Sequence, residues 1–377
     1  MSFVTHNKSH KPTVLLDLNH PTDFHFFREF IIESRQKGMS MYITVKQRQY
    51  LPELLKFHDV PYILKGKRAY TFWGKLIGLL REIYQLYLLA RAIKPEVFIS
   101  FASPYAAITG RLLRIPVIGF DDTECNPLLH QITPRFSDLI ITPRCFQKSF
   151  GRKHIRFEGY KESVYLKEIF LEKNLYANEI PEPDQKEPFI LVRFVSYHAT
   201  HELGKKGLSP EEKEEIVHRL KQYHRVYISS EGPLPEKLKI FELKAPPAHI
   251  HHLLKNAVLY FGESTTMAAE AALLGTSAIL VEDEGRGFTD DIEKRTGLLR
   301  RFSMKEWNQA VKHAEASLEK QGKGTLQEAA SLAEIFSETT DIKELLNWIV
   351  QNPWEHIKQL KHTPDKINDF KSNKSPR

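Results

Sequence analysis

A short apolar run, a tight turn and a helix rich in small residues follow one another in residues 258–275. Three hydroxyl side chains, Ser264, Thr265 and Thr266, stand where that helix begins. The first N–H groups of a helix have no partner inside it and lie at the positive end of its dipole, so they bind anions. The turn is therefore a candidate cradle for a diphosphate, and Glu270, within two turns, could accept hydrogen bonds from a ribose diol. A plain helix cap made by Ser264 or Thr265 explains the same residues without a ligand, and that alternative stays open.

A second polar group follows the first strand expected in the same half of the chain. Arg193 and Ser196 close that strand, and a loop carrying His201 and Lys205 comes next, with glycines at both ends of residues 204–207. A glycine-punctuated basic loop suits a phosphate. The alternative is that these loop side chains, above all Lys205, are exposed to solvent and bind no ligand.

The composition excludes several classes of protein. A length of 377 residues, 41% of them hydrophobic and 27% charged, predicts a globular chain of about two domains. The net charge of +7 is spread along the chain without a basic block, so nucleic-acid binding is not expected. Cys125 and Cys145 form no Cys-x-x-Cys pair, which favours a reducing cytoplasm over a disulfide framework.

Cofactor and metal motifs are not found. The chain has no P-loop motif, and no Gly-x-Gly-x-x-Gly follows its first strand, so P-loop NTPases and nicotinamide enzymes are disfavoured and no cofactor is predicted. His249, His251 and His252 are of metal-binding type. Adjacent helical residues point about 100° apart, so only His249 and His252 would share a face, and no metal site is predicted.

Apolar β-branched runs alternate with amphipathic helical patterns twice along the chain. The expected strands are residues 13–17, 41–45, 60–64, 97–101, 116–120 and 139–142, then 189–195, 225–229, 258–261 and 277–281. Such alternation predicts two parallel sheets covered by helices, with a ligand cleft at their carboxyl ends. We expect an N-terminal Rossmann-like domain at 1–173, a C-terminal one at 186–340, and a C-terminal helix with a frayed tail at 341–377.

Residues 71–93 predict a helix with a wider apolar surface than one buried face needs. Lys75, Arg81, Glu82 and Arg91 interrupt the apolar run, so it is too broken to span a bilayer. Because most of these charges are basic, two interpretations stay open: a well-buried core helix, or a peripheral contact with anionic lipid.

Residues 262–270, Gly-Glu-Ser-Thr-Thr-Met-Ala-Ala-Glu, resemble the nucleotide-sugar segment of GT-B enzymes, notably the UDP-N-acetylglucosamine 2-epimerases and MurG-type glycosyltransferases. Further patches resemble a prokaryotic family of unassigned function close to those enzymes; they are residues 17–27, 103–107, 122–124, 141–146, 159–162, 193–196, 204–207 and 229–233. The resemblance covers residues 13–300. It implies an α/β chain of GT-B architecture, with the hydroxyl turn on the diphosphate and Glu270 on the ribose.

The resemblance also implies where a base would lie. In GT-B transferases the base follows the first strand of the N-terminal domain, where this chain has His20, Asp23 and His25. His25 titrates near neutrality and is the first candidate, with Asp23 second. Relatives often have histidine at the position of Asp23, so the choice stays open. A hydrogen-bonded core histidine is the alternative for His25.

Three more site residues follow from the resemblance. Glu124 stands after the strand at 116–120, where the epimerases have a glutamate facing the sugar ring, although a solvated turn is the alternative. Glu231 lies in one of the matching patches. His252 belongs to a segment whose backbone recognises the base in the epimerases. The basic loop near Lys205 takes the place of a metal.

Together these features predict a metal-independent glycosyltransferase that uses a nucleoside-diphosphate sugar, with a UDP-sugar favoured. The acceptor is expected to be a glycan or lipid-linked molecule in surface polysaccharide or glycoconjugate assembly, on the cytoplasmic side of the membrane. The alternatives are a nucleotide-sugar 2-epimerase or hydrolase, and a non-catalytic nucleotide-sugar-binding protein.

Overall fold

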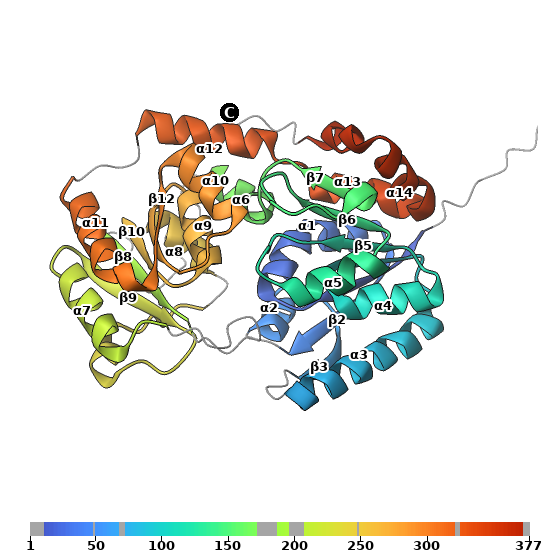
Figure 1. Ribbon diagram of the computed structural model, residues 1–377, viewed down its shortest axis with the longest axis horizontal. Helices are drawn as coiled ribbons and strands as arrows, with labels where there is room; N and C mark the ends of the chain where they lie inside the picture. The colour runs from blue at the N-terminus through green and yellow to red at the C-terminus, as the bar shows by residue number, and fades with distance from the viewer. Residues whose placement is uncertain are drawn as a thin grey trace, which may run out of the picture.

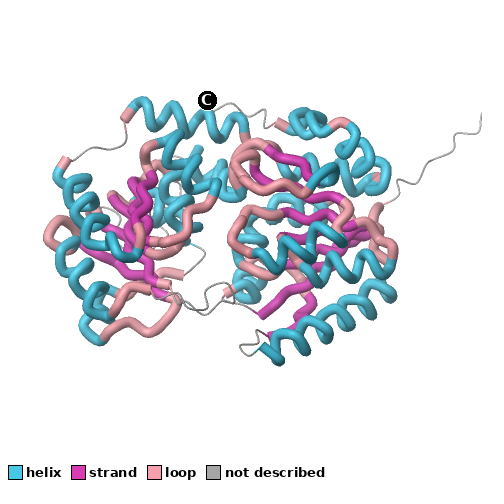
Figure 2. The backbone as a smooth tube through the Cα atoms, viewed as in Figure 1, coloured by secondary structure: helices cyan, strands magenta, loops and turns pink. Residues whose placement is uncertain are grey.

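The computed structural model describes residues 11–47, 50–67, 72–171, 187–195, 207–246, 249–320 and 325–371. They form two α/β domains that lie side by side (Figure 1). In each domain a parallel sheet lies between helices, as the tube view shows (Figure 2).

The first sheet has the order β3-β2-β1-β4-β5-β6-β7 and is parallel throughout. Its strands are β1 (Thr13–Leu18), β2 (Ser40–Gln47), β3 (Ile63–Lys67), β4 (Val97–Phe101), β5 (Val117–Phe120), β6 (Leu139–Pro143) and β7 (His154–Phe157). Its helices are α1 (Pro21–Gln36), α2 (Leu51–Phe57), α3 (Phe72–Ile93), α4 (Pro104–Leu113) and α5 (Pro127–Phe136), and α6 (Lys161–Leu171) follows between the two domains. The strand order reverses between β1 and β4, which is where open α/β sheets bind ligands.

The second sheet has the order β12-β11-β10-β8-β9 and is also parallel. Its strands are β8 (Phe189–Phe194), β9 (Arg225–Ser230), β10 (Leu259–Gly262), β11 (Ser277–Val281) and β12 (Leu299–Phe302). Its helices are α7 (Pro210–Leu220), α8 (Ile250–Asn256), α9 (Thr265–Leu273), α10 (Gly287–Thr296), α11 (Trp307–Glu319) and α12 (Leu326–Glu338). Here the order reverses between β8 and β10, the two strands that precede the predicted donor residues.

The last helices return to the first domain, where Figure 1 shows α13 (Ile342–Gln351) and α14 (Pro353–His362). Helix α13 packs on α1, and Asn347 Nδ2 and Lys343 Nζ both lie 3.1 Å from the Glu33 carboxylate. The tail after Pro364 was expected to fray. It instead forms a 3₁₀ helix over Pro364–Phe370 because Ile367 finds a buried position.

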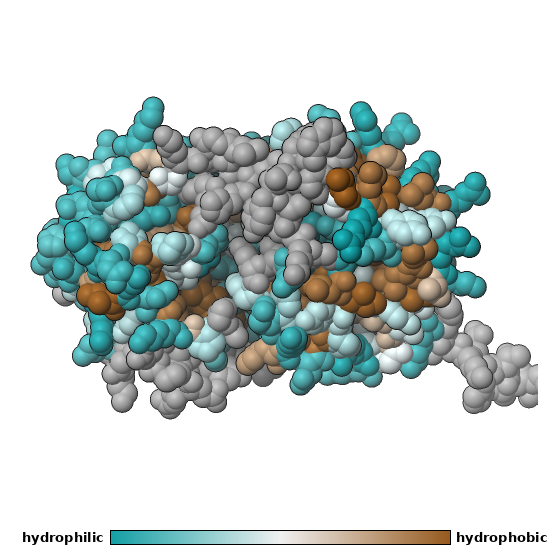
Figure 3. Space-filling view, turned by 90° about the horizontal axis from the view of Figure 1, so that it is seen from below, coloured by the Kyte–Doolittle hydropathy of each residue, from teal (hydrophilic) through white to brown (hydrophobic). Residues whose placement is uncertain are grey.

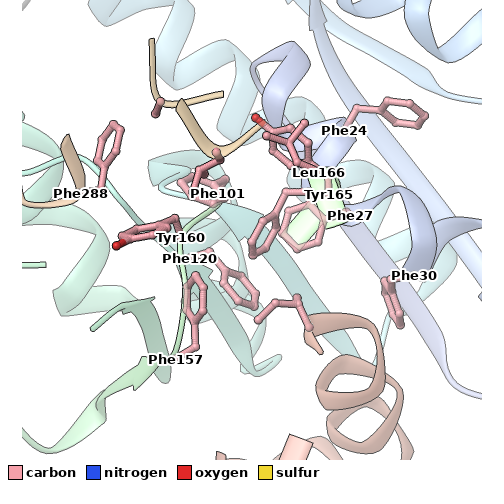
Figure 4. Packing of buried hydrophobic residues seen from close by; sticks show 14 of the residues in the cluster. Phe24, Phe27, Phe30, Phe101, Phe120, Phe157, Tyr160, Tyr165, Leu166 and Phe288 are labelled. Carbon is pink, nitrogen blue, oxygen red and sulfur yellow. The ribbon is translucent and has the colours of Figure 1, made fainter. Parts of the chain in front are cut away.

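A single hydrophobic cluster runs through both domains and makes them one packed body. It joins aromatic residues of α1 and the first sheet to apolar residues of α9 and α10, with α6 between them. Figure 4 shows members of this cluster, among them Tyr165 of α6 and the rings of Phe27 and Phe120, whose centres are 5.4 Å apart. A second cluster fills the far side of the second sheet.

Helix α3 lies on the outside of the first domain. Its inner residues Leu86 and Ala90 pack on Leu15 and Phe98, while other apolar side chains of the same helix are exposed. It is therefore only half buried. None of the described helices combines the length and apolarity needed to cross a membrane.

A buried ion pair lies where β1 ends. Asp17 is fully buried, and it accepts hydrogen bonds from Lys65 Nζ, Thr44 Oγ1 at 2.6 Å and Ser103 Oγ at 2.5 Å. Lys65 also donates to Asn19 Oδ1 at 2.9 Å. Burial alone would raise the pKa of Asp17, but the Lys65 charge and these donors lower it. The network joins β1, β2, β3 and the start of α4.

Gly287, at the start of α10, lies at a close contact between the two domains. A Cβ atom there would come within 2.4 Å of the Cys145 carbonyl oxygen and 2.7 Å of Glu124 Oε1. Gly287→Ala is expected to lower the free energy of unfolding by about 1–3 kcal/mol, because the first-domain loop must move. Urea denaturation measures this. Gly78→Ala is the control, since a Cβ there contacts nothing within 4 Å and stabilises a helix by about 0.5–1 kcal/mol. Equal stability of the two variants would contradict the prediction.

Candidate active site

The loop after β1 forms a capping box. His20 caps α1, and its Nδ1 accepts the N–H of Thr22 at 3.3 Å. Asp23 Oδ2 in turn accepts the N–H groups of Asn19 and His20, both at 3.0 Å. These side chains therefore hold the backbone at the start of the helix.

Asp23 also forms a buried ion pair. Lys161 Nζ of α6 donates to its Oδ1 at 3.0 Å, and the ammonium lies 3.5 Å from the centre of the Phe101 ring. Burial raises the pKa of Asp23, and the Lys161 charge opposes that shift. Because both carboxylate oxygens already accept hydrogen bonds, the geometry favours a structural role for Asp23 over that of a base.

His25 lies at the boundary between the domains. Its ring centre is 5.5 Å from that of Tyr165 and 4.9 Å from that of His251, which belongs to α8 of the second domain. Its Nε2 is buried and has no hydrogen-bond partner among the described residues. Burial, and then the neighbouring His251, hold the pKa of His25 well below its usual value, so the ring is neutral at pH 7. The core-histidine alternative predicts a hydrogen bond that this nitrogen does not make within the described chain.

Glu270 joins this cluster from the other side. Tyr165 OH donates to its Oε1 at 2.6 Å, and His251 Nε2 lies 3.1 Å from the same oxygen. Within the part of the chain that the structure describes, these hydrogen bonds use Oε1, which leaves Oε2 to accept from a ligand. The candidate base and the candidate ribose carboxylate are thus connected through one histidine.

Ser264 caps α9, as the ligand-free interpretation expected. Its Oγ accepts the N–H of Met267 at 3.4 Å, and Thr265 is buried while Thr266 is half-buried. The cap satisfies one N–H of the first turn and does not exclude an anion on the others. Gly262 brings this turn against β8, because a Cβ there would lie 2.5 Å from the Arg193 carbonyl oxygen.

Arg193 faces the same edge of the second sheet. It donates to Ser229 Oγ at 2.7 Å and to Glu231 Oε1 at 2.8 Å, and its Nε is buried without a partner among the described residues. Tyr50 reaches this group from the first domain: burial and then the Glu270 charge raise its pKa to about 12. The other predicted residues of this loop, Ser196, His201 and Lys205, lie outside the described residues.

Glu124 lies at the domain contact rather than beside His25. Its Oε1 accepts the N–H of Gln147 at 3.2 Å and faces Gly287, while its Oε2 is buried without a partner in the described chain. A freely solvated turn does not fit this burial. His252 is half-buried on α8, and the structure brings its neighbour His251 to Glu270 instead.

Sequence reasoning missed five residues of this site: Tyr50, Lys161, Glu162, Tyr165 and His251. Lys161 and Glu162 entered only as part of a resembling patch, His251 entered only as a residue of metal-binding type, and the other two carried no signal. Among the described residues, no group of three or more histidine, cysteine, aspartate or glutamate side chains could hold a metal ion.

Glu162 gives the site a testable pH dependence. Burial, and then the charges of Asp122 and Glu270, raise its pKa to about 8. A raised folded-state pKa stabilises the protein at low pH, and this stability is lost as pH rises through the folded value. Glu162→Gln, which is always neutral, is therefore expected to match the wild type near pH 5 and to exceed its stability above pH 8. Chemical denaturation across this range measures the difference, and a pH-independent difference would contradict it.

The two facing Rossmann-like domains, with C-terminal helices returning to the first, define the GT-B fold. The structure superposes on the UDP-N-acetylglucosamine 2-epimerase from Rickettsia bellii with a TM-score of 0.63 and 15% identity, covering 94% of this chain and 99% of that one. The Methanocaldococcus jannaschii UDP-GlcNAc 2-epimerase, in complex with UDP-GlcNAc and UDP, superposes with a TM-score of 0.61 and 13% identity, covering 89% of this chain and 99% of that one. The spinosyn forosaminyltransferase superposes with a TM-score of 0.58 and 14% identity, covering 90% of this chain and 100% of that one.

The sequence itself places the chain in a family. The family model DUF354, described as a protein of unknown function, matches residues 13–336, so this chain belongs to DUF354. No curated protein matches the sequence. The resemblance to a GT-B-like family of unassigned function and the expected fold class are both confirmed.

Proposed function

We propose that this protein is a metal-independent glycosyltransferase that uses a nucleoside-diphosphate sugar on the cytoplasmic side of the membrane. The observation that carries the proposal is the cluster of His25, His251 and Glu270 across the domain boundary. In this cluster the neutral imidazole of His25, whose Nε2 has no partner in the described chain, is connected through His251 to Glu270. Glu270 lies on α9, the helix whose first N–H groups could bind an anion. A UDP-sugar is favoured because the similar M. jannaschii structure holds UDP and UDP-GlcNAc.

Each of these residues would have a separate role in the transfer of the sugar. The first N–H groups of α9 and the guanidinium of Arg193 stabilise the departing diphosphate, and Glu270 Oε2 accepts from the ribose hydroxyls. An acceptor hydroxyl attacks the anomeric carbon, the bond from that carbon to the diphosphate oxygen breaks, and the hydroxyl proton passes to His25 Nε2. The acceptor class we propose is a glycan or lipid-linked molecule of surface polysaccharide or glycoconjugate assembly.

An epimerase or hydrolase of the nucleotide sugar is the second candidate. The observation that favours it is the group of carboxyls around Lys161, in which Glu162 has a raised pKa and Asp122 lies close enough to raise it. A neutral carboxylic acid next to a carboxylate is an acid–base pair. An epimerase converts the donor with no acceptor present, whereas a transferase hydrolyses it only slowly.

A thermal-shift screen against UDP, GDP, CMP, dTDP and their common sugars tests donor binding. One nucleotide at about 100 times its Kd should add about 2.7 kcal/mol of stability. Glu270→Gln, which still accepts from Tyr165 but carries no charge, is expected to abolish most of the shift. Glu293→Gln, on the partly exposed surface pair with Arg300, is the matched control. The absence of a thermal shift with any nucleotide would refute the proposal. A thermal shift without turnover would indicate a non-catalytic nucleotide-sugar-binding protein.

A further inference from the structure

Helix α3 presents an apolar face to solvent. Ile77, Leu80, Tyr84 and Leu88 are between 49% and 64% exposed. At about 100° per residue, their Cα–Cβ bonds point within about 60° of one line along the helix. Figure 3 shows hydrophobic residues running across this side of the first domain, in the right half of the view. Large apolar side chains gathered on one exposed face mark a contact surface.

The exposed charges on the described side chains of α3 have one sign. Arg81 and Arg91 are exposed and lie about 40° to either side of the apolar line. The acidic residue of the helix, Glu82, is buried and pairs inward with Lys46 Nζ at 2.8 Å. Every exposed charge on the described side chains of α3 is therefore basic, and the helix keeps its carboxylate away from the surface.

We propose that this face of α3 docks on an anionic lipid bilayer. An apolar face that carries arginines among its apolar side chains matches the acyl boundary and the phosphate layer of such a surface, and a tyrosine suits its interface. Lys46 neutralises Glu82 inside the domain, so the exposed charges on the described side chains of α3 are all basic. The helix lies flat on the bilayer, and the sheet behind it stays in water. This contact needs no nucleotide, so it stands apart from the sugar chemistry.

Co-sedimentation of the full chain with vesicles tests the proposal. We expect binding to phosphatidylcholine vesicles that contain phosphatidylglycerol, weaker binding to phosphatidylcholine alone, and release by salt. The variant Leu80→Ser with Tyr84→Ser should weaken binding about tenfold or more, since each loses an inserted apolar side chain. Arg81→Gln should weaken it about fivefold on the anionic vesicles only.

Matched exposed sites give the control. Ile240 and Leu326 are 82% and 93% exposed in the second domain, so Ile240→Ser with Leu326→Ser removes as much surface apolarity elsewhere. This variant should bind vesicles like the wild type. Equal weakening in both double variants, or no vesicle binding by the wild type, would overturn the proposal. So would a wild-type dimer in sedimentation that Leu80→Ser with Tyr84→Ser dissociates, because the face would then serve a second copy. A thermal shift with nucleotide is read separately on the same variants.

Discussion

Lys65→Met is expected to lower the free energy of unfolding by about 3–5 kcal/mol, the typical cost of leaving one half of a buried ion pair alone. Asp17 would stay fully buried and lose the cation that lowers its pKa. Thr44 and Ser103 would still donate to it, but neither carries a charge. Urea denaturation at neutral pH measures the loss.

The pH dependence sharpens this test. In the wild type the lowered pKa of Asp17 stabilises the protein above about 3.8, and that stability is lost as pH falls through the folded value. The gap between wild type and Lys65→Met should therefore narrow in acid. The exposed pair of Lys237 and Glu214 is the control, and Lys237→Met should leave the free energy of unfolding close to that of the wild type. Similar effects at both lysines would show that burial is not the cause.

His25→Gln is expected to lower kcat by about 10²–10⁴-fold, the usual contribution of a general base, while the Kd of the nucleotide stays unchanged. The reason is positional: Nε2 is the nitrogen left without a partner in the described chain. Single-turnover transfer with the donor found by the thermal-shift screen measures it. Because the pKa of His25 lies well below 6.5, wild-type kcat should stay constant from neutral into mildly acidic pH before it falls.

His58→Gln provides the matched control for that variant. His58 also contacts Phe24, with ring centres 5.2 Å apart, but it lies at the end of α2 and is partly exposed. Its replacement should leave kcat unchanged. If His25→Gln also retains full kcat, the base lies elsewhere, and Asp23 becomes the next candidate despite its hydrogen bonds.

The fold was largely predictable because buried parallel strands are continuous apolar runs, which need no partner to be recognised. Two strands and three helices were not predicted: β7, β12, α5, α6 and α10. The strand β12 reads Leu-Arg-Arg-Phe on a sheet edge, where only Leu299 is buried. The strand β7 is equally short and polar, and α5 contains Pro134.

The site was predictable only where its residues are neighbours in the chain. The capping residue Ser264 and the acidic residue of the first turn of α1 follow from spacing. Lys161 meets Asp23 across 138 positions and Tyr165 meets Glu270 across 105, and no periodicity encodes such contacts. Burial and the Lys161 ion pair also give Asp23, the second candidate for the base, a structural role that its position in the sequence did not indicate.

Because α13 returns to the first domain, that domain is translated first but cannot finish folding first. The face of α1 that α13 covers stays uncovered during translation until the entire second domain has been synthesised. Domains fold as units as they emerge, so the second domain, although made later, can close its far-side core first. Until Ile342–Gln351 emerges, the nascent first domain shows an open apolar surface, which makes this stretch of translation the interval in which a chaperone would engage the chain.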